Sequence, residues 1–328
     1  MKQFFSCILI LCLSLSALGQ KIKGVVLDQE TNFPIDYASV FFDGTFVGTT
    51  TGEDGGFELD VSKYKSRPLS VSAVGYHSAS ITSFSPDLRI QILLTPKVFT
   101  LEEVVVSTKS LVRKRKACMR IFKNQFIGLT SNARRCYILN EEDISFNYGN
   151  DRDTLRAFAS KPIHIQNLAL GYDISYHLDR FEYDRHSQTT LFVGNIIFNH
   201  DLSEDKDSRR KYERQRAYAY TGSSMHFFRA LWTDSLESEG FIISNYRSEQ
   251  VLQSDYIVSR DNQGRKFLIY NEDIKIDFYN QLSFISFREY QVYFEEDGYF
   301  NPLPIVWTGK MSEQRVADFL PYEYIFPR

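Results

Sequence analysis

The segment between positions 216 and 229 holds the most suggestive combination of polar residues in the sequence. A helix that begins at Ser223 places His226 and Arg229 three residues apart on one face, and Arg216 lies a short distance upstream. Backbone N–H groups at the start of such a helix can bind an anion. These residues therefore predict a phosphate or carboxylate site formed by Arg216, Ser223, His226 and Arg229. The alternative, which is the more common arrangement, is a capped helix whose His and Arg side chains bond to neighbouring strands.

A second concentration of charge lies between Ser107 and Asn140, where nine basic residues occur without a single acid. Basic helices can lie on anionic membranes. This interpretation predicts peripheral contact with an anionic membrane through Arg113, Lys114, Arg115 and Lys116. The alternative is a solvated helix face whose charge is balanced by acids elsewhere. The nine residues are Lys109, Arg113, Lys114, Arg115, Lys116, Arg120, Lys123, Arg134 and Arg135.

The sequence carries no recognisable catalytic signature. The segment Gly222–Met225 fails the Gly-x-Ser-x-Gly pattern of a nucleophile elbow at its last position. No phosphate-binding glycine motif and no calcium-binding loop is present. We therefore expect no catalytic residue, no cofactor and no metal ligand. A pair of carboxylates for glycan hydrolysis is defined by its spacing in the fold, so sequence spacing does not reveal one.

The first residues are typical of an export signal. Lys2 precedes an apolar run from Phe4 to Ala17, and small residues at Ala17 and Gly19 fit a cleavage site. We expect residues 1–19 to be a signal peptide and the protein to be exported, to the periplasm or the outer membrane. Two cysteines then remain, Cys118 and Cys136, and either a disulfide or two buried free thiols fits an exported protein.

Length and composition exclude several classes of protein. With 328 residues, 43% hydrophobic and 24% charged, the chain resembles an ordinary globular protein of about two domains. The net charge of −3 argues against a nucleic-acid partner, because such binders are usually basic. Aromatic residues make up 15% of the chain, and they suit pleated sheets as well as sugar-binding or protein-binding surfaces.

Residues 20–106 show the period-2 alternation of short strands. Apolar residues alternate at Ala38–Phe42, Phe57–Val61, Leu69–Ala73 and Ile90–Leu94, with turn-forming residues between these runs. Strands of this length and spacing are typical of a β-sandwich. We therefore expect a seven-stranded β-sandwich.

Several motifs of this region, in their order, resemble the carboxypeptidase regulatory-like domain. The resemblance implies a transthyretin-like β-sandwich that serves as an accessory module. The segment Leu101–Val106 is similar to the one that follows such domains in TonB-dependent transporters, but residues 107–328 are too few for the plug and large barrel of a transporter. None of the six His residues is followed by Glu at the third position, as a zinc carboxypeptidase requires. The motifs are Gly24-Val25-Val26, Pro34 to Val40, Gly48 to Thr51, Asp54 to Phe57 and Ser72 to Tyr76.

Residues 107–328 resemble no family and are expected to form a mainly antiparallel β domain with two or three helices. The predicted helices span Ser110–Phe126 and Asp205–Ala217, and a third helix runs to Trp232 with Ser223 or Ser224 as its N-cap. A further short helix starts at Ser312. The predicted strands are Tyr137–Leu139, Ile144–Tyr148, His164–Ile165, Ile174–Leu178, Leu191–Phe198, Phe241–Tyr246, Tyr256–Ser259, Lys266–Tyr270, Ile274–Tyr279 and Phe287–Phe294.

These observations favour an exported, non-enzymatic binding or assembly protein of the cell envelope, with an envelope protein or a glycan as its partner. The alternative is a glycan or peptide hydrolase with carboxylates in a cleft of the second domain. An enzyme requires a concave pocket with converging titratable groups, whereas a binding protein can use an exposed apolar or aromatic surface. No feature of the sequence points to a particular oligomeric state.

Overall fold

The computed structural model describes residues 20–327 except 65, 86–87, 98–107, 149–152 and 204. The predicted signal peptide, the segment Leu101–Val106 and the predicted domain boundary lie outside the described residues. The chain folds into two compact units, one mainly of residues up to Glu103 and the other mainly of residues from Val104 onward. The short segments Ser160–Pro162 and Asn195–Ile197 group with the first unit.

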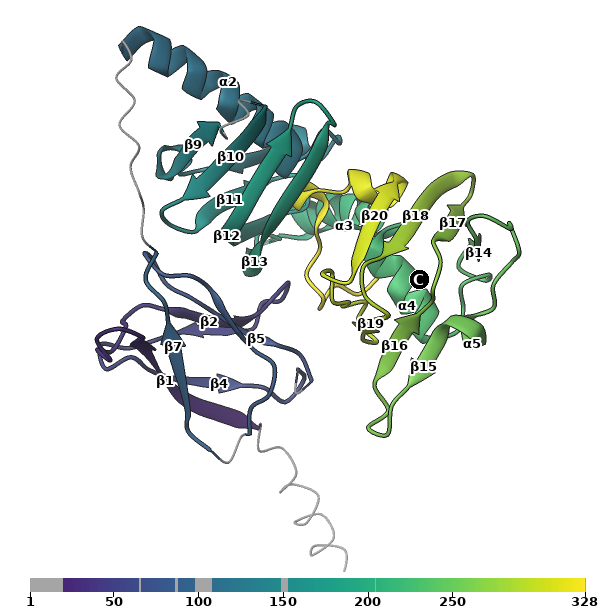
Figure 1. Cartoon of the computed structure of the whole chain (residues 1–328), viewed down its shortest axis with the longest axis horizontal. Helices are drawn as coiled ribbons and strands as arrows, with labels where there is room; N and C mark the ends of the chain where they lie inside the picture. The colour runs from purple at the N-terminus through teal and green to yellow at the C-terminus, as the bar shows by residue number, and fades with distance from the viewer. Residues whose placement is uncertain are drawn as a thin grey trace, which may run out of the picture. The chain divides into compact units, whose positions relative to one another are not determined.

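The first unit is a sandwich of two small sheets, as the alternation predicts (Figure 1). One sheet has the order β4-β1-β7 and the other β3-β2-β5-β6. All pairings are antiparallel except that of β1 with β7. The seven strands are β1 (Lys21–Asp28), β2 (Ser39–Phe42), β3 (Gly48–Thr50), β4 (Gly56–Asp60), β5 (Leu69–Ser72), β6 (Ala79–Ile81) and β7 (Ile90–Leu94).

The core of this sandwich consists of the alternating apolar residues. Val40 and Phe42 from one sheet and Leu59 and Ile92 from the other belong to one buried cluster. Thr51 closes the start of β2, because its hydroxyl donates to the Ile35 carbonyl and accepts from the Ala38 amide. The predicted mainly β architecture of the first unit is confirmed.

The second unit begins with a helix packed on a sheet. The helix α2 (Thr108–Phe126) lies against one face of strands β8 to β13, with the order β8-β11-β12-β10-β9 and β13 also paired to β12 (Figure 1). Phe122 and Phe126 make ring contacts with Phe146, Phe181, Tyr176 and Phe192 of the sheet. The strands are β8 (Cys136–Ile138), β9 (Ile144–Tyr148), β10 (Thr154–Ala159), β11 (Ile163–Asn167), β12 (Tyr172–Asp184) and β13 (Thr189–Asp201), with 3₁₀ turns η1 (Ala133–Arg135) and η2 (Glu141–Asp143).

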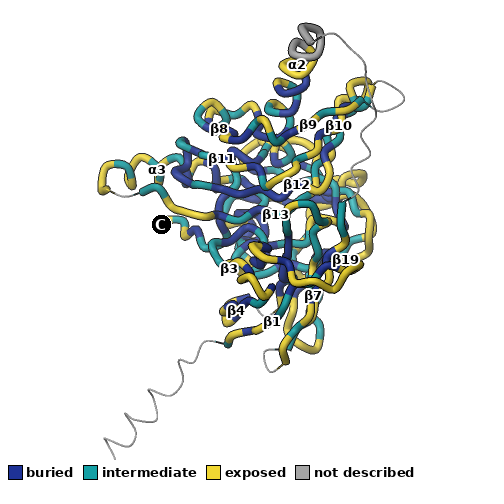
Figure 2. The backbone as a smooth tube through the Cα atoms, turned by 90° about the vertical axis from the view of Figure 1, so that its left-hand side faces the viewer, coloured by how far each residue is buried: buried dark blue, intermediate teal, exposed yellow. Residues whose placement is uncertain are grey.

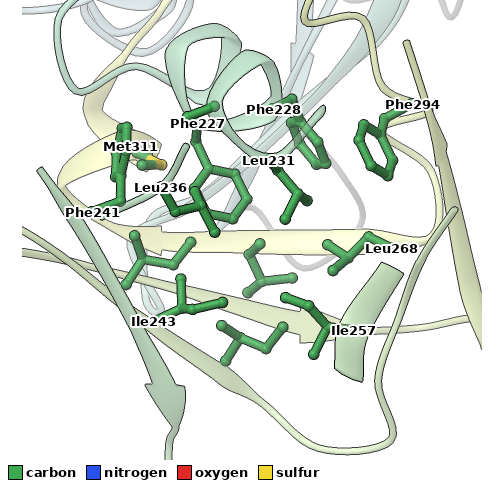
Figure 3. Packing of buried hydrophobic residues seen from close by; sticks show 14 of the residues in the cluster. Phe227, Phe228, Leu231, Leu236, Phe241, Ile243, Ile257, Leu268, Phe294 and Met311 are labelled. Atoms are coloured by element: carbon green, nitrogen blue, oxygen red, sulfur yellow. The ribbon is translucent and has the colours of Figure 1, made fainter. Parts of the chain in front are cut away.

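Two further sheets form the rest of the second unit around the helix α4 (Ser224–Trp232). Phe227, Phe228 and Leu231 of α4 pack with residues of both sheets in one buried cluster (Figure 3). The sheets have the orders β14-β17-β18-β20 and β15-β16-β19. The remaining elements are α3 (Lys206–Tyr220), β14 (Phe241–Asn245), α5 (Ser254–Ile257), β15 (Val258–Arg260), β16 (Lys266–Ile269), β17 (Ile274–Phe278), β18 (Gln281–Phe287), β19 (Gln291–Phe294), β20 (Ile305–Gly309), η3 (Lys310–Glu313) and η4 (Val316–Asp318).

The helix ends follow the capping residues of the sequence. Asp205 caps α3 through the amides of Asp207 and Ser208 in a capping box, and Ser223 caps α4. The helix α3 continues three residues past the predicted end at Ala217, where Ala219 and Tyr220 are buried. Figure 2, coloured by the burial of each residue, shows that the central strands are largely buried. It also shows that the first turn of α2 with described side chains is exposed.

Three predictions for the second unit were wrong in detail, and some strands were missed. The expected strand at Tyr256–Ser259 begins inside α5, and the expected strand Phe287–Phe294 is the end of β18, a turn and β19. The helix expected from Ser312 is replaced by η3 and η4, because Gln314 and Arg315 between them are extended. Strands β10, β20 and all of β18 except Phe287 were missed, since β10 and β20 offer few large apolar residues in alternation. Mainly antiparallel pairing is confirmed for the described strands of this unit.

Candidate functional site

The residues of the predicted anion site on α4 are engaged by the protein itself. The Ser223 hydroxyl accepts from the His226 amide at 3.0 Å. His226 Nδ1 accepts from the Gly222 amide at 3.1 Å, and its Nε2 lies 3.2 Å from a Glu239 carboxylate oxygen. The ring is packed against Tyr220, Phe241 and other aromatic side chains. Burial lowers the pKa of His226, and the Glu239 carboxylate opposes this shift without cancelling it.

This arrangement predicts a pH dependence of stability. Because the pKa of His226 is lower in the folded state, the unfolded chain binds more protons near pH 6. The contribution is present above the ordinary imidazole pKa and is lost as pH falls below it and through the lower pKa of the folded state. We expect His226→Gln to lose less free energy of unfolding than the wild type between about pH 7.5 and about pH 5.5. Urea denaturation at each pH measures this, and equal losses in both proteins would contradict it.

Arg216 is held by the second unit through four hydrogen bonds. Its guanidinium donates to both carboxylate oxygens of Asp201 at 2.9 and 2.7 Å and to the carbonyls of Leu170 and Gly171 at 2.7 and 3.1 Å. It also lies over the Tyr172 ring, 4.0 Å from the centroid. The side chain is 6% exposed. Its position is explained by this bidentate ion pair and these carbonyls.

Arg229 is likewise bound within the protein. Its Nε donates to the Asp297 carbonyl at 2.8 Å and its Nη2 to the Tyr322 carbonyl at 3.1 Å, while the guanidinium faces the Tyr220 ring. The structure therefore brings Ser223, His226 and Arg229 together on α4, and it directs Arg216 toward Asp201. A site for an external anion at these four residues stays a prediction.

A cavity of about 880 Å³ in the second unit was not anticipated by any motif. Its walls come from the end of α2 and the loop after it, the end of α3, the β17–β18 turn, and the η3–η4 segment. Cavities of this size commonly hold small ligands. The lining residues are Asn124, Gln125, Gly128, Leu129, Thr130, Ser131, Tyr218, Ala219, Thr221, Gly222, Phe278, Gln281, Lys310, Glu313, Gln314, Arg315 and Asp318.

Two glycines allow these walls to approach one another. Gly222 has φ +74, and a Cβ there would lie 2.7 Å from the Phe278 ring. Gly128 has φ +112, and a Cβ there would lie 3.0 Å from the Arg315 Cβ. L-residues rarely adopt such φ values, so both turns depend on glycine. These glycines are the one feature of the sequence that relates to the cavity. Neither could be recognised as part of a cavity before the fold was known.

The cavity lining includes a buried carboxylate that is already hydrogen-bonded within the protein. Asp318 is 6% exposed. One of its carboxylate oxygens accepts from the Thr130 hydroxyl at 2.8 Å and from the side-chain amide of Asn132 at 2.9 Å. Its second oxygen lies 3.1 Å from the same hydroxyl. Burial raises the pKa of Asp318, although these hydrogen bonds partly oppose the shift. Asp318 therefore joins the C-terminal segment to the loop after α2.

The other charged residues that line the cavity are also partnered within the protein. Lys310 and Glu313 form an ion pair at 2.6 Å. The Arg315 guanidinium donates to the carbonyls of Gln125 and Gln314 and to that of Ser312. The cavity is also lined by uncharged polar side chains that make no hydrogen bond to another group in the described part of the chain. These are Asn124, Ser131, Tyr218 and Gln281.

Some basic residues of α2 bond to other groups of the protein, and other basic residues of this helix are exposed to solvent. Arg115 donates to the carbonyls of Ile144 and Glu141 at 2.6 Å each, and Lys123 pairs with the Glu141 carboxylate. Lys114, Lys116 and Arg120 are exposed. The side chain of Arg113 lies outside the described residues. Of the four residues predicted to contact a membrane, Arg115 therefore has a structural role.

The two cysteines of the second unit are free thiols in the structure, and both are buried. Burial raises the pKa of Cys136 to about 12, while Cys118 lies 3.6 Å from the Tyr148 hydroxyl. Among residues 20–327 with the gaps given above, no group of three or more His, Cys, Asp and Glu side chains is placed to hold a metal ion. The helices in the same residues include none long and apolar enough to span a membrane.

Comparison with known proteins identifies the first unit. Residues 22–106 match the family model of the CarboxypepD_reg-like domain, the carboxypeptidase regulatory-like domain. The match extends over the described sandwich strands β1 to β7. A search of curated proteins found no match to the chain.

Proposed function

We propose that this chain is an exported, non-enzymatic binding protein of the cell envelope, located in the periplasm or at the outer membrane. The cavity of the second unit holds its ligand, and the carboxypeptidase regulatory-like domain is an accessory module. The export part of the proposal rests on Lys2, the apolar run to Ala17 and the small residues before Gln20. The binding part rests on the cavity.

One observation carries the choice of binding over catalysis. Asp318, the deeply buried carboxylate in the cavity, accepts hydrogen bonds from Thr130 and Asn132. Glu313 is paired with Lys310. A hydrolase needs an acid and a base that converge on the scissile bond and can exchange protons with it. Here the carboxylates are committed to other side chains, so the cavity is better suited to hold a ligand than to cleave it.

A glycan or peptide hydrolase is the second candidate, and the raised pKa of Asp318 favours it, since perturbed carboxyls in cavities are typical of catalytic sites. The two candidates separate in one experiment. Residues 20–328 are incubated with soluble oligosaccharides and peptides of the envelope, and binding and product masses are measured together. Our proposal expects binding with unchanged masses. Cleavage of a probe by the wild type would establish the hydrolase instead.

Export is tested separately by cell fractionation and by sequencing the N-terminus of the recovered protein. We expect recovery from the periplasm or the outer membrane with Gln20 as the first residue, because the small residues at Ala17 and Gly19 fit signal cleavage. Recovery from the cytoplasm with Met1 retained would contradict the proposal.

The proposal includes peripheral contact with an anionic membrane through the exposed cations of α2. Each basic residue near an anionic surface contributes about 1 kcal/mol to binding. We therefore expect the triple change Lys114→Glu, Lys116→Glu and Arg120→Glu to weaken binding to vesicles that contain anionic lipid by about tenfold or more. Co-sedimentation with vesicles measures this.

A matched control reverses three exposed basic residues of α3, Arg209, Arg210 and Lys211, and changes the net charge by the same amount. We expect this control to retain most of the vesicle binding, since the contact is assigned to α2. Equal loss in both variants would show that net charge alone attracts the protein. Absence of vesicle binding by the wild type would remove the membrane contact from the proposal.

A further inference from the structure

One of the two aromatic residues that line the cavity, Tyr218, offers an exposed surface for stacking. Tyr218 lines the cavity from the end of α3, and its side chain is 74% exposed. An exposed tyrosine presents an apolar ring face together with a polar hydroxyl. Such a ring fits the apolar C–H face of a sugar ring, while the hydroxyl remains able to hydrogen-bond.

The polar lining of the cavity is largely uncharged. Asn124 and Gln281 contribute side-chain amides, and Ser131 contributes a hydroxyl. Gln314 donates its amide to the Ala219 carbonyl at 3.0 Å. Amides and hydroxyls both donate and accept hydrogen bonds, as do the hydroxyl groups of a polyol. The lining therefore complements a ligand that carries many neutral hydroxyls.

The charges beside the cavity do not select an ion. The Lys310–Glu313 pair contributes one charge of each sign, and Arg315 is directed to the backbone carbonyls of the η3–η4 segment and α2. Asp318 is bound to Thr130 and Asn132. A cavity for an anion or a cation would offer a charged group without such partners, because a buried ligand charge needs compensation.

The walls also argue against an extended peptide. Peptide recognition commonly uses an open strand edge, a long apolar groove or an arginine cluster. This cavity is bounded by two helix ends, the β17–β18 turn and the η3–η4 segment. Its large apolar contributions come from Leu129 and Phe278, which are too few for a helix-binding groove.

We infer that the cavity binds a neutral glycan, with the Tyr218 ring stacked on one sugar ring and the amides of Asn124 and Gln281 bonded to its hydroxyls. This inference rests on the proposed function and specifies the ligand class for the same cavity. It requires no chemical change in the glycan.

The test uses residues 20–328 and defined probes: cello-, malto-, manno- and chito-oligosaccharides, and a set of extended peptides of mixed composition. Binding is measured by isothermal titration calorimetry. We expect at least one oligosaccharide to bind, and Tyr218→Ala and Gln281→Ala each to weaken that binding about tenfold. Tyr256→Ala, which removes a 78% exposed tyrosine outside the cavity, is expected to leave the affinity unchanged.

The outcomes separate this inference from the proposed function. Binding of a peptide that depends on Tyr218, without any oligosaccharide binding, would overturn the glycan assignment and leave the cavity as a binding site. Oligosaccharide binding that is unaffected by Tyr218→Ala and Gln281→Ala would place the glycan elsewhere and overturn the inference. Binding of neither class would overturn both the inference and the proposed function of the cavity.

Discussion

Replacing Phe228 by alanine is expected to lower the free energy of unfolding of the second unit by about 3–5 kcal/mol. Phe228 is fully buried on α4. Its ring is stacked on Phe300 at 4.5 Å between centroids and contacts Phe294 and Trp307. Alanine removes these contacts and leaves a cavity that the two surrounding sheets cannot close completely.

Urea denaturation followed by tryptophan fluorescence measures this effect, because Trp307 contacts the same ring. Tyr256→Ala is the control, since this tyrosine is exposed and its removal is expected to change stability by less than about 0.5 kcal/mol. A loss below about 1 kcal/mol for Phe228→Ala would contradict the assignment of α4 to the centre of this core.

The second large effect is expected for Arg216→Met, which should cost about 2–4 kcal/mol. Methionine keeps much of the side-chain volume but leaves the Leu170 carbonyl without its donor, while the Gly171 carbonyl keeps the hydrogen bond from the Leu202 amide. Asp201 loses its cationic partner as well, although it still accepts from the Ser203 amide and hydroxyl and its side chain is 40% exposed to water. The loss of stability is therefore smaller than that expected when a fully buried carboxylate is left without a partner.

The matched control is Arg209→Met, which removes an exposed arginine from the same helix and is expected to be nearly neutral. Both variants are compared by urea denaturation at neutral pH. If Arg216→Met lost no more stability than Arg209→Met, the bidentate pair would not stabilise the fold. Arg216 would then again be a candidate residue for binding an external anion.

The sandwich could be predicted because its pattern is local. Val40, Phe42, Leu59 and Ile92 lie at period-2 positions of their strands, and this local period is enough to place them on the inner faces of the two sheets. The N-caps Asp205 and Ser223 are local in the same sense. Strand β20 could not be predicted in the same way, because two prolines precede it and its apolar residues Ile305, Val306 and Trp307 are consecutive and do not alternate with polar ones.

The cavity could not be predicted, because its residues come from segments separated by most of the second unit. Thr130 and Asp318 meet across 188 positions, and Tyr218 comes from a helix between them. By contrast, the cluster His226–Arg229 was visible in the sequence, but its partners Glu239, Asp297 and Tyr322 were not. Polar residues close in sequence predict a site only when the fold leaves them without partners.

The central claim is that the cavity of the second unit binds a ligand and leaves it unchanged. Its most direct test is to incubate residues 20–328 with the oligosaccharide and peptide panel, separate the protein by gel filtration, and weigh the retained ligand by mass spectrometry. We predict retention of an oligosaccharide at its original mass by the wild type and its loss in Tyr218→Ala combined with Gln281→Ala. Shortened products, or equal retention by this variant, would contradict the claim.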